Sequence, residues 1–514
     1  MSLNRAAGFW PWISGAALIL YLLLAFAAAS TREPWCDEAW FNGPARNLAY
    51  HGYMGTPDLD PQSNIGKPRV RLDGINRYTY WVTPLYMVVQ AAWFKIAGFD
   101  ILRARAASVM WGIVALLAWW TIAARLTDRL TAGIAMLLIG VEYNFVFAAS
   151  DARMDMMTAA LGSLALALYL RERESSFPRA LLLTHIALAA AVLTHPIAVA
   201  YGLAWVTMVL LLDRKHVQGK YLPLCAAPYV IAAAGWGLYI AQAPQLFLTQ
   251  FAGNSTERGP GLTQAWAALK LELSHRYAEN FGMAAWTSGP ARAKIAIALL
   301  YIGGLVWVAG SRDLRSKIGV RVVLACAAAV LAFFWLFEGT KTPVYLPHTL
   351  PWLCLIAAIT LADFAMRPGP LRYAVPAVLL AVVAIQTLAT VMPARRDPYR
   401  TLYAPTMTFL SQHLRPADTV MGDAAIGWAL GFDRPVTDDA WLGYRTGKKL
   451  DWLVVTPVYA GTIESVSHNR PDVYRHIAGL LAGYHVVFAL KDYRIYVRNQ
   501  SAPDQREFAN ARVP

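Results

Sequence analysis

The feature that most constrains this chain is a series of long apolar runs within its first 392 residues. Each has about the 20 residues that a helix needs to cross a hydrocarbon layer of roughly 30 Å. Of the 514 residues, 57% are hydrophobic and 15% charged, and the mean hydropathy is +0.38, which excludes an ordinary soluble domain. The sequence predicts a polytopic α-helical membrane protein with eleven spans, at 11–30, 103–125, 130–149, 156–171, 179–195, 196–213, 221–241, 293–310, 320–338, 345–366 and 371–392.

A shorter apolar stretch at 84–99 contains Gln90 and Lys95 and is predicted to be an amphipathic surface helix. If it does not span and the N-terminus is cytoplasmic, the short loops rich in Lys and Arg all face the cytoplasm, while the opposite short loops carry only Arg153 and Lys341. The formal net charge of +14 then reflects topology, and we expect no nucleic-acid partner. The cytoplasmic loops are 125–129, 171–179, 214–220, 312–321 and 367–372.

Three segments then share the outer face: 31–102, 242–292 and the tail 394–514. The tail is more polar and combines helical with strand-like patterns. We therefore expect a transmembrane domain at 1–393 and a small periplasmic or extracellular α/β domain at 394–514. In the tail, helices are predicted at 402–414 and 471–482, and strands at 452–456, 484–490 and 493–498.

Two acidic sequences lie where spans reach this outer face. Asp37 and Glu38 follow the first span, and Arg153 and Asp155 follow the third. A structural interpretation makes Asp37 the N-cap of a surface helix ending at His51-Gly52, with Glu38 complementing the helix dipole. The alternative is catalytic: carboxylates converging at the membrane boundary could bind a divalent metal, or one could take a proton from a hydroxyl while a cation stabilises a phosphate leaving group.

Other ionisable side chains are expected on the same face. Lys341 lies in a short outer loop and Arg258 in a long one, so either could meet a phosphate. His195 ends the fifth span and His348 begins the tenth, and each is either a packed or capping residue or a ligand. Glu142 lies in the outer third of the third span, a depth at which an ionisable group normally faces a cavity or a partner.

Taken together, these motifs resemble the GT-C glycosyltransferases. The most similar branch uses polyprenyl-phosphate sugars and includes the lipid A aminoarabinose transferase and the protein O-mannosyltransferases. The resemblance covers roughly residues 10–366, and its stretches occur in the family's order: Asp37-Glu38-Ala39-Trp40, Pro84-Leu85-Tyr86, Trp93-Phe94-Lys95, residues 102–108 around Arg105, Ala152-Arg153-Met154-Asp155, Leu193-Thr194-His195-Pro196, Gln250-Phe251, and Lys341 with Tyr345.

The resemblance implies a GT-C-like fold and a role for each candidate residue. Asp37 and Glu38 correspond to the catalytic or metal-proximal carboxylates and Asp155 to a second-loop acid. Many relatives have a Glu-Lys pair where this chain has Val82-Thr83, so Arg77 becomes a substitute contact. The expected donor-phosphate contacts are Lys341, Arg258, Arg153, Arg77 and Tyr345, and the expected cavity or metal-proximal residues are Glu142, His195 and His348.

The implied function is transfer of a sugar, with inversion, from a polyprenyl-phosphate donor to an acceptor hydroxyl on the outer face of the bacterial inner membrane. The acceptor would be an envelope glycan, a lipid or a protein. Dependence on a divalent metal stays open. No nucleotide cofactor is expected, because neither GxGxxG nor GxxxxGK[ST] occurs in the sequence.

Three other classes of protein compete with this interpretation. A transporter or lipid flippase would place ionisable groups near the bilayer midplane, often in two related halves, and only Glu142 and His185 point that way. An O-antigen ligase or polymerase would rely on outer-loop arginines, whereas acidic motifs dominate here. A sensory or scaffold protein would leave the acidic loops unexplained.

Overall fold

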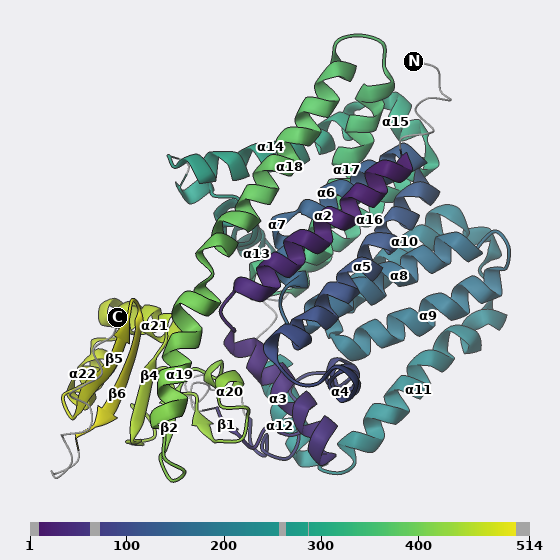
Figure 1. Cartoon of the computed structure of the whole chain (residues 1–514). Helices are drawn as coiled ribbons and strands as arrows, with labels where there is room; N and C mark the ends of the chain where they lie inside the picture. The colour runs from purple at the N-terminus through teal and green to yellow at the C-terminus, as the bar shows by residue number, and fades with distance from the viewer. Residues whose placement is uncertain (1–9, 62–71, 256–263, 286, 500–514) are drawn as a thin grey trace.

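A computed structural model describes residues 10–61, 72–255, 264–285 and 287–499. Within it, a helix or a bent helix pair occupies each of the eleven predicted spans (Figure 1). These helices are α2 (Trp10–Thr31), α5 (Ile101–Leu126), α6 (Arg129–Val141) with α7 (Tyr143–Ala149), α8 (Met154–Glu172), α9 (Phe177–Thr194), α10 (Val199–Leu212), α11 (Leu222–Ile240), α14 (Gly289–Gly310), α16 (Ile318–Phe337), α17 (Leu346–Met366) and α18 (Leu371–Arg396).

Length and apolar composition alone identify fewer spans than eleven. Among the described residues, eight helices are long and apolar enough to cross a membrane, and a ninth is formed if α6 and α7, bent by 65°, are one broken span. The other two predicted spans coincide with α8, whose 19 residues include Asp155, Arg171 and Glu172, and with the apolar helix at Pro196–Leu212, which is shorter than 18 residues. The fold is the predicted polytopic helical one.

Close packing at the centre of the bundle positions part of the site. The apolar window of α17 is 72% buried, whereas α11 lies at the edge of the bundle and buries only Pro228. Gly162 of α8 packs on Tyr201 of α10 so closely that an added Cβ would lie 2.2 Å from the tyrosine ring. This contact lets the Tyr201 hydroxyl lie 3.0 Å from Nδ1 of His348 in α17.

Helices outside the bundle cover its outer end. They are α3 (Cys36–His51), α4 (Leu85–Ala97), α12 (Pro244–Ser255), α13 (Ala265–Leu271) and η6 (Glu272–Glu279). As predicted for 84–99, α4 is too short to span the membrane. It buries one face, including Gln90, while Lys95 is exposed.

The predicted end of α3 is confirmed, since Gly52 caps it with φ of 79°. The predicted N-cap is wrong: the cap is Trp35, because the Glu38 carboxylate accepts the Trp35 N–H and so starts the helix one residue before Asp37.

The tail forms a mixed sheet with helices on both faces. Its elements are η9 (Tyr399–Tyr403), α19 (Ala404–His413), β2 (Val420–Gly422), α20 (Ile426–Ala429), β3 (Val436–Thr437), β4 (Trp452–Val455), α21 (Pro457–Asn469), α22 (Pro471–Leu481), β5 (Tyr484–Leu490) and β6 (Tyr493–Arg498). The helices and strands predicted for the tail are confirmed to within two residues, and β5 and β6 form the predicted hairpin.

A strand from the first outer segment joins this sheet. The strand order is β1-β3-β2-β4-β6-β5, in which β1 (Leu59–Asp60) pairs in parallel with β3. The sheet therefore combines residues from both ends of the chain and lies beside α3, as Figure 1 shows. α18 carries the chain to this sheet from the opposite end of the bundle.

Short helical turns complete the described chain. They are η2 (Pro196–Ala198), η3 (Arg214–His216), η4 (Gly219–Tyr221), η7 (Met283–Ala285), α15 (Arg312–Ser316) and η8 (Pro343–Tyr345).

Candidate active site

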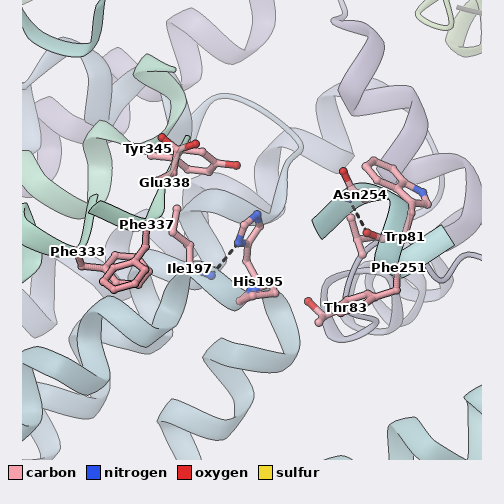
Figure 2. Close-up of a pocket in the computed structure, with 12 residues that line it drawn as sticks. Trp81, Thr83, His195, Ile197, Phe251, Asn254, Phe333, Phe337, Glu338 and Tyr345 are labelled. Carbon is pink, nitrogen blue, oxygen red and sulfur yellow. Dashed lines mark hydrogen bonds between the residues drawn. The ribbon is translucent and has the colours of Figure 1, made fainter. Parts of the chain in front are cut away.

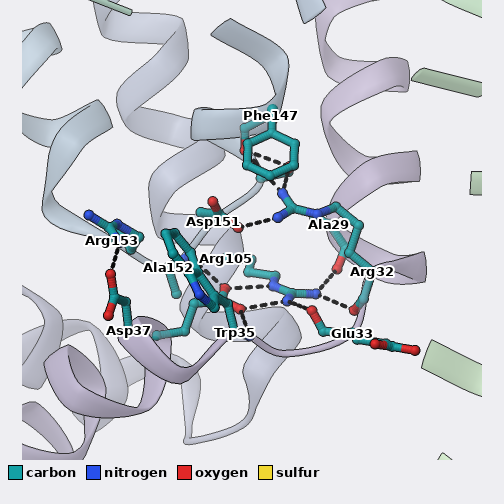
Figure 3. A network of polar contacts seen from close by, with 12 residues as sticks. Ala29, Arg32, Glu33, Trp35, Asp37, Arg105, Phe147, Asp151, Ala152 and Arg153 are labelled. Carbon is teal, nitrogen blue, oxygen red and sulfur yellow. Dashed lines mark hydrogen bonds and ion pairs between the residues drawn. The ribbon is translucent and has the colours of Figure 1, made fainter. Parts of the chain in front are cut away.

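The two acidic sequences meet at the outer end of the bundle, where α3 lies against the loop before α8 (Figure 3). Arg153 forms ion pairs with both acids, through Nη1 to Asp37 and through Nε to Asp155 Oδ2 at 2.9 Å. Its guanidinium also lies over the Trp35 ring, 4.5 Å from the ring centroid. Arg153 thus holds Asp37 and Asp155 in one cluster.

These side chains differ in how far water can reach them. The side chain of Asp37 is 34% exposed, whereas those of Asp155 and Arg153 are 3% and 7% exposed. Oδ1 of Asp155 has no hydrogen-bond partner within the described part of the chain, although the carboxylate interacts electrostatically with His195 and His348. Asp37 is therefore the acid of this cluster that a reactant can approach directly.

Glu38, next to Asp37, occupies a different environment. It is fully buried, and its two oxygens accept bonds from Arg105 at 2.8 and 2.7 Å. They also accept the backbone N–H groups of Trp35 and Ala152 at 2.9 and 2.8 Å. Burial alone would raise the pKa of Glu38, but Arg105 and these hydrogen bonds lower it below its usual value. Because the charge is satisfied from every side, the geometry favours a positioning role over the catalytic role that we expected.

Arg105 joins the end of the first span to the first outer helix (Figure 3). Besides Glu38, it donates to the carbonyl oxygens of Ala29, Arg32 and Glu33 at 2.8 to 3.0 Å, at the end of α2 and just after it. Carbonyls at a helix C-terminus lack partners inside the helix, so this arginine satisfies groups that would otherwise be unpaired. All five guanidinium N–H groups are used.

A second ion pair closes the same junction. Arg32 lies 2.9 Å from Asp151 and stacks over the Phe147 ring at 3.5 Å. Burial raises the pKa of Asp151 to about 6, although Arg32 acts in the opposite direction. The Arg32–Asp151 pair ties the loop before α8 to the segment between α2 and α3, and the Arg105–Glu38 pair ties α5 to the start of α3.

A cavity of about 310 Å³ lies beside the cluster. Figure 2 shows the residues that line it. Trp81, in its wall, stacks on Phe41 at 5.2 Å, and Phe41 lies 5.5 Å from the Arg153 guanidinium. Asn254 fixes this wall by donating to the Trp81 carbonyl oxygen at 2.7 Å. The lining is mainly apolar and aromatic, with a few polar groups: Trp81, Val82, Thr83, His195, Pro196, Ile197, Phe251, Asn254, Phe333, Phe337, Glu338 and Tyr345.

Three predicted residues gather at or next to this cavity. His195 lines it and accepts the Ile197 N–H through Nδ1 at 3.1 Å, so it also caps the turn before α10. The Tyr345 ring lies 5.7 Å from the His195 ring and 6.3 Å from the His348 ring. Nε2 of His348 is buried and has no hydrogen-bond partner among the described residues.

The ammonium group of Lys341 is bound by neighbouring groups of the protein. Its ammonium donates to the carbonyl oxygens of Phe334 and Trp335 at 2.7 and 2.8 Å and lies 3.1 Å from Glu272. Burial lowers the pKa of Lys341, and Glu272 partly offsets that effect. These contacts use all three ammonium protons. In this conformation Lys341 caps the C-terminus of α16, which does not favour the expected contact with a donor phosphate.

Two further buried charges complete this neighbourhood. Arg276 of η6 pairs with Glu272 at 2.8 Å and also with Glu338, which lines the cavity. With Lys341 they form a cluster of two cations and two anions between the second outer segment and the α16–α17 loop. The cluster holds the cavity wall.

The remaining predicted residues lie away from the Asp37 cluster or outside the described chain. Glu142 is the N-cap of α7 and accepts the Phe145 N–H at 2.9 Å at the bend of the broken span. Arg77 stacks on Tyr53 at 4.1 Å and lines a different cavity. Arg258 lies outside the described residues. The geometry therefore gives Glu142 a structural role rather than a place in the cavity.

The sequence patterns assigned no role to several charged residues that hold the site. They belong to ion pairs that are buried or, for Arg32 with Asp151, partly buried: Arg105, Arg32, Asp151, Glu272 and Arg276. One usable signal was the arginine inside the apolar run 103–125, since such a residue at a span end normally has a specific partner. Partners more than 60 positions apart, such as Arg105 and Glu38, leave no mark in local spacing.

Comparison with known proteins supports the fold. The protein family described as dolichyl-phosphate-mannose-protein mannosyltransferase matches residues 82–239. The structure of ArnT from Cupriavidus metallidurans bound to undecaprenyl phosphate is similar with a TM-score of 0.60 and 14% identity, and the match covers 96% of this chain and 99% of that one. No curated protein matches the sequence.

Archaeal structures give the same result at lower similarity. AglB from Archaeoglobus fulgidus, in complex with an inhibitory peptide and a dolichol-phosphate, matches with a TM-score of 0.52 and 12% identity over 97% of this chain and 76% of that one. The Archaeoglobus fulgidus oligosaccharyltransferase in complex with zinc and sulfate matches with a TM-score of 0.50 and 11% identity over 93% and 73%. These findings confirm the predicted GT-C-like fold.

Proposed function

We propose that this protein transfers a sugar from a polyprenyl-phosphate donor to an acceptor hydroxyl at the outer face of the membrane. The observation that carries the proposal is the cluster of Asp37, Arg153 and Asp155 beside a mainly aromatic cavity. Two proteins of similar fold were solved with undecaprenyl phosphate and with a dolichol-phosphate, which supports a lipid-linked donor.

Asp37 is the general base in the proposed reaction. Its carboxylate is the most exposed of the cluster, and one ion pair with Arg153 orients it. It takes the proton of the acceptor hydroxyl while that oxygen attacks the anomeric carbon. The bond from this carbon to the phosphate oxygen breaks, and its electron pair leaves with the polyprenyl phosphate. Attack from the face opposite the phosphate inverts the anomeric centre.

The leaving group needs a charge partner more than an acid. The donor is a phosphodiester, and breaking its bond to the sugar releases polyprenyl phosphate, a monoester that is a stable anion. Fixed positive charge nearby is therefore the main stabilisation that the protein supplies. Arg153 is the cation of the Asp37 cluster, and Arg258 follows Asn254 of the cavity wall by four positions. Phe251, Phe333 and Phe337 suit an isoprenoid chain. Oδ1 of Asp155, which has no hydrogen-bond partner among the described residues, is available for a hydroxyl of the sugar.

Metal dependence is a separate question. A similar oligosaccharyltransferase was solved with zinc. Within the described residues, no group of three or more His, Cys, Asp or Glu side chains is arranged to hold a metal ion. We therefore derive no step through a metal.

The proposed orientation places the catalytic end outside. The charges of the short loops favour a cytoplasmic N-terminus, which puts α3, the cavity and the tail domain of residues 394–514 on the periplasmic side of a bacterial inner membrane. The acceptor would then be an envelope glycan, a lipid or an exported protein.

The test uses the purified protein in lipid nanodiscs with a panel of polyprenyl-phosphate sugars and an envelope extract as acceptor. We expect one donor to release polyprenyl phosphate and to label a product in the extract. Asp37→Asn should reduce that rate by about 10²–10⁴-fold. Asp433→Asn, an exposed acid of the tail, is the matched control and should keep the wild-type rate. Consumption of no donor, or equal rates for Asp37→Asn and wild type, would contradict the proposal and favour a transport assay.

A further inference from the structure

The tail domain touches the helix that carries Asp37 through a buried hydrogen bond. Trp40 lies one turn after Asp37 in α3, and its Nε1 donates to Oδ2 of Asp438 at 3.1 Å. Trp40 and Asp438 are both only 7% exposed. A carboxylate in such a position needs hydrogen-bond partners, and the Trp40 N–H is one of them.

The other contacts of Asp438 fix it within the tail. Its Oδ1 accepts the hydroxyl of Tyr459, from α21, at 2.7 Å. Its backbone N–H donates to the Asp60 carbonyl oxygen at 2.8 Å, which continues the pairing of β1 with β3. The carboxylate therefore has a defined position relative to the sheet. Its hydrogen bond with Trp40 fixes the first turns of α3 relative to the same sheet.

Asp37 is thus held between two frameworks. On the membrane side, Arg153 binds its carboxylate, and Glu38 with Asn42 anchors α3 to Ala152. On the opposite side, the Trp40–Asp438 bond ties the same end of α3 to the sheet. A displacement of about 1 Å at a reacting group can cost about 10²-fold in rate, so a rigid support at this point matters for turnover.

We propose that Trp40 and Asp438 are positioning residues that orient Asp37 for proton transfer, which makes the tail domain a working part of the active site. This inference rests on the proposed function. It predicts a specific kinetic pattern, because a misplaced base slows the chemical step without weakening the binding of the donor.

The experiment measures kcat and the donor KM for Trp40→Phe, Asp438→Ala, Asp438→Asn and the double variant Trp40→Phe/Asp438→Ala. We expect Trp40→Phe and Asp438→Ala each to lower kcat by about 10–100-fold with KM within about two-fold of wild type. Asp438→Asn keeps an oxygen for the Trp40 N–H and should restore most of the rate. The double variant should be no slower than the slower single variant, because both changes remove one interaction.

A matched control separates positioning from simple docking of the tail. Arg46, nine residues after Asp37 on the same helix, pairs with Asp433 of the tail. Asp433→Ala removes this tether and should leave kcat unchanged. If Asp438→Ala does not fold, Tyr459→Phe removes only the hydroxyl that supports Asp438, and a several-fold fall in kcat is expected.

The experiment distinguishes failure of the positioning role from failure of the proposed function. If wild type consumes no donor, the proposed function itself is wrong. If wild type is active and Asp37→Asn is not, but Trp40→Phe and Tyr459→Phe have wild-type kcat, only the positioning role is wrong. An equal loss of kcat in Asp433→Ala would likewise overturn it, because any tether to the tail would then suffice.

Discussion

The two adjacent acidic residues at the start of α3 differ in their burial and in the number of their hydrogen-bond partners. Asp37 is partly exposed and has one ion pair, whereas Glu38 is buried within four hydrogen bonds. Exposed ion pairs typically contribute 0–1 kcal/mol to stability, and the Asp37–Arg153 pair is nearer to that case because Asp37 is partly exposed and Arg153 keeps Asp155 as a second partner. Removing one partner of a fully buried pair costs about 3–5 kcal/mol. The same two-residue motif thus contains a reactive group and the group that holds it in place.

This contrast predicts different effects of two conservative substitutions. Glu38→Gln leaves the charge of Arg105 uncompensated in the interior and should lower the free energy of unfolding by about 3–5 kcal/mol. Asp37→Asn should change it by less than about 1 kcal/mol while abolishing most activity. Thermal unfolding of both variants in the same detergent measures the difference. Equal thermal midpoints for the two variants would show that the Glu38–Arg105 pair does not support the fold.

At this scale the sequence predicted residue types better than partners. Asp37, Arg153 and Asp155 were singled out as charged residues at span ends, and they lie together. Lys341 was singled out for the same reason, yet its ammonium lies against carbonyl oxygens at the end of α16, the helix that precedes it. A cation near a helix C-terminus and a cation near a ligand look alike in sequence, because only the three-dimensional path of the loop separates them.

At the scale of elements, the main finding is a strand from the first outer segment in the sheet of the tail. β1 is two residues long, so no alternating pattern could reveal it. β2 and β3 were also missed, being three and two residues long, whereas the longer β5 and β6 were predicted within their observed bounds. The bend between α6 and α7 follows from Glu142, whose carboxylate caps α7 where the span is broken.

The junction between α3 and the sheet contains a third acid whose ionisation depends on folding. Asp423 directly follows β2 and is buried, with 2% of its surface exposed. Burial, together with the charge of Asp438, raises the pKa of Asp423 to about 7. Asp37 adds to this effect, while the Ala425 N–H opposes it. Because the folded pKa exceeds the value of about 4 in the unfolded chain, the associated stability is fully present below pH 4 and is lost as the pH rises through 7.

Asp423→Asn should therefore stabilise the protein more at high pH than at low pH. We expect its thermal midpoint to exceed that of wild type by several degrees at pH 8, and by clearly less at pH 5. Asp433→Asn, exposed and in the same domain, serves as the control and should show no such trend. A gap between Asp423→Asn and wild type that is constant or grows toward pH 5 would refute the assignment.

At the scale of the whole molecule, the chemistry is gathered at one end of a helical bundle. The membrane segments, the surface helix α4 and the secondary structure of the tail follow from apolar run length, periodicity and turn signals, which are local properties. Several of the contacts that build the site join residues more than 100 positions apart, such as Asp37 with Arg153 and Trp40 with Asp438. Periodicity contains no information about such pairs, so the sequence predicted the fold class and not the organisation of the site.

The proposed orientation makes a prediction about accessibility. Glu464, on α21 of the tail, and Ser316, the last residue of α15, are both exposed. Glu464→Cys should react with a membrane-impermeant maleimide in cells with a permeable outer membrane, above the level of wild type with its four native cysteines. Ser316→Cys should react only after the inner membrane is disrupted. The reverse pattern would place the tail in the cytoplasm.

The most direct test of the central claim is the time course of polyprenyl phosphate release in nanodiscs, with wild type and Asp37→Asn compared at equal amounts of folded protein. If the cluster at the start of α3 is the catalytic centre of a sugar transferase, wild type releases the lipid phosphate together with a glycosylated product, and Asp37→Asn falls by at least about 10²-fold with an unchanged thermal midpoint. Release at the same rate by both proteins would contradict the account.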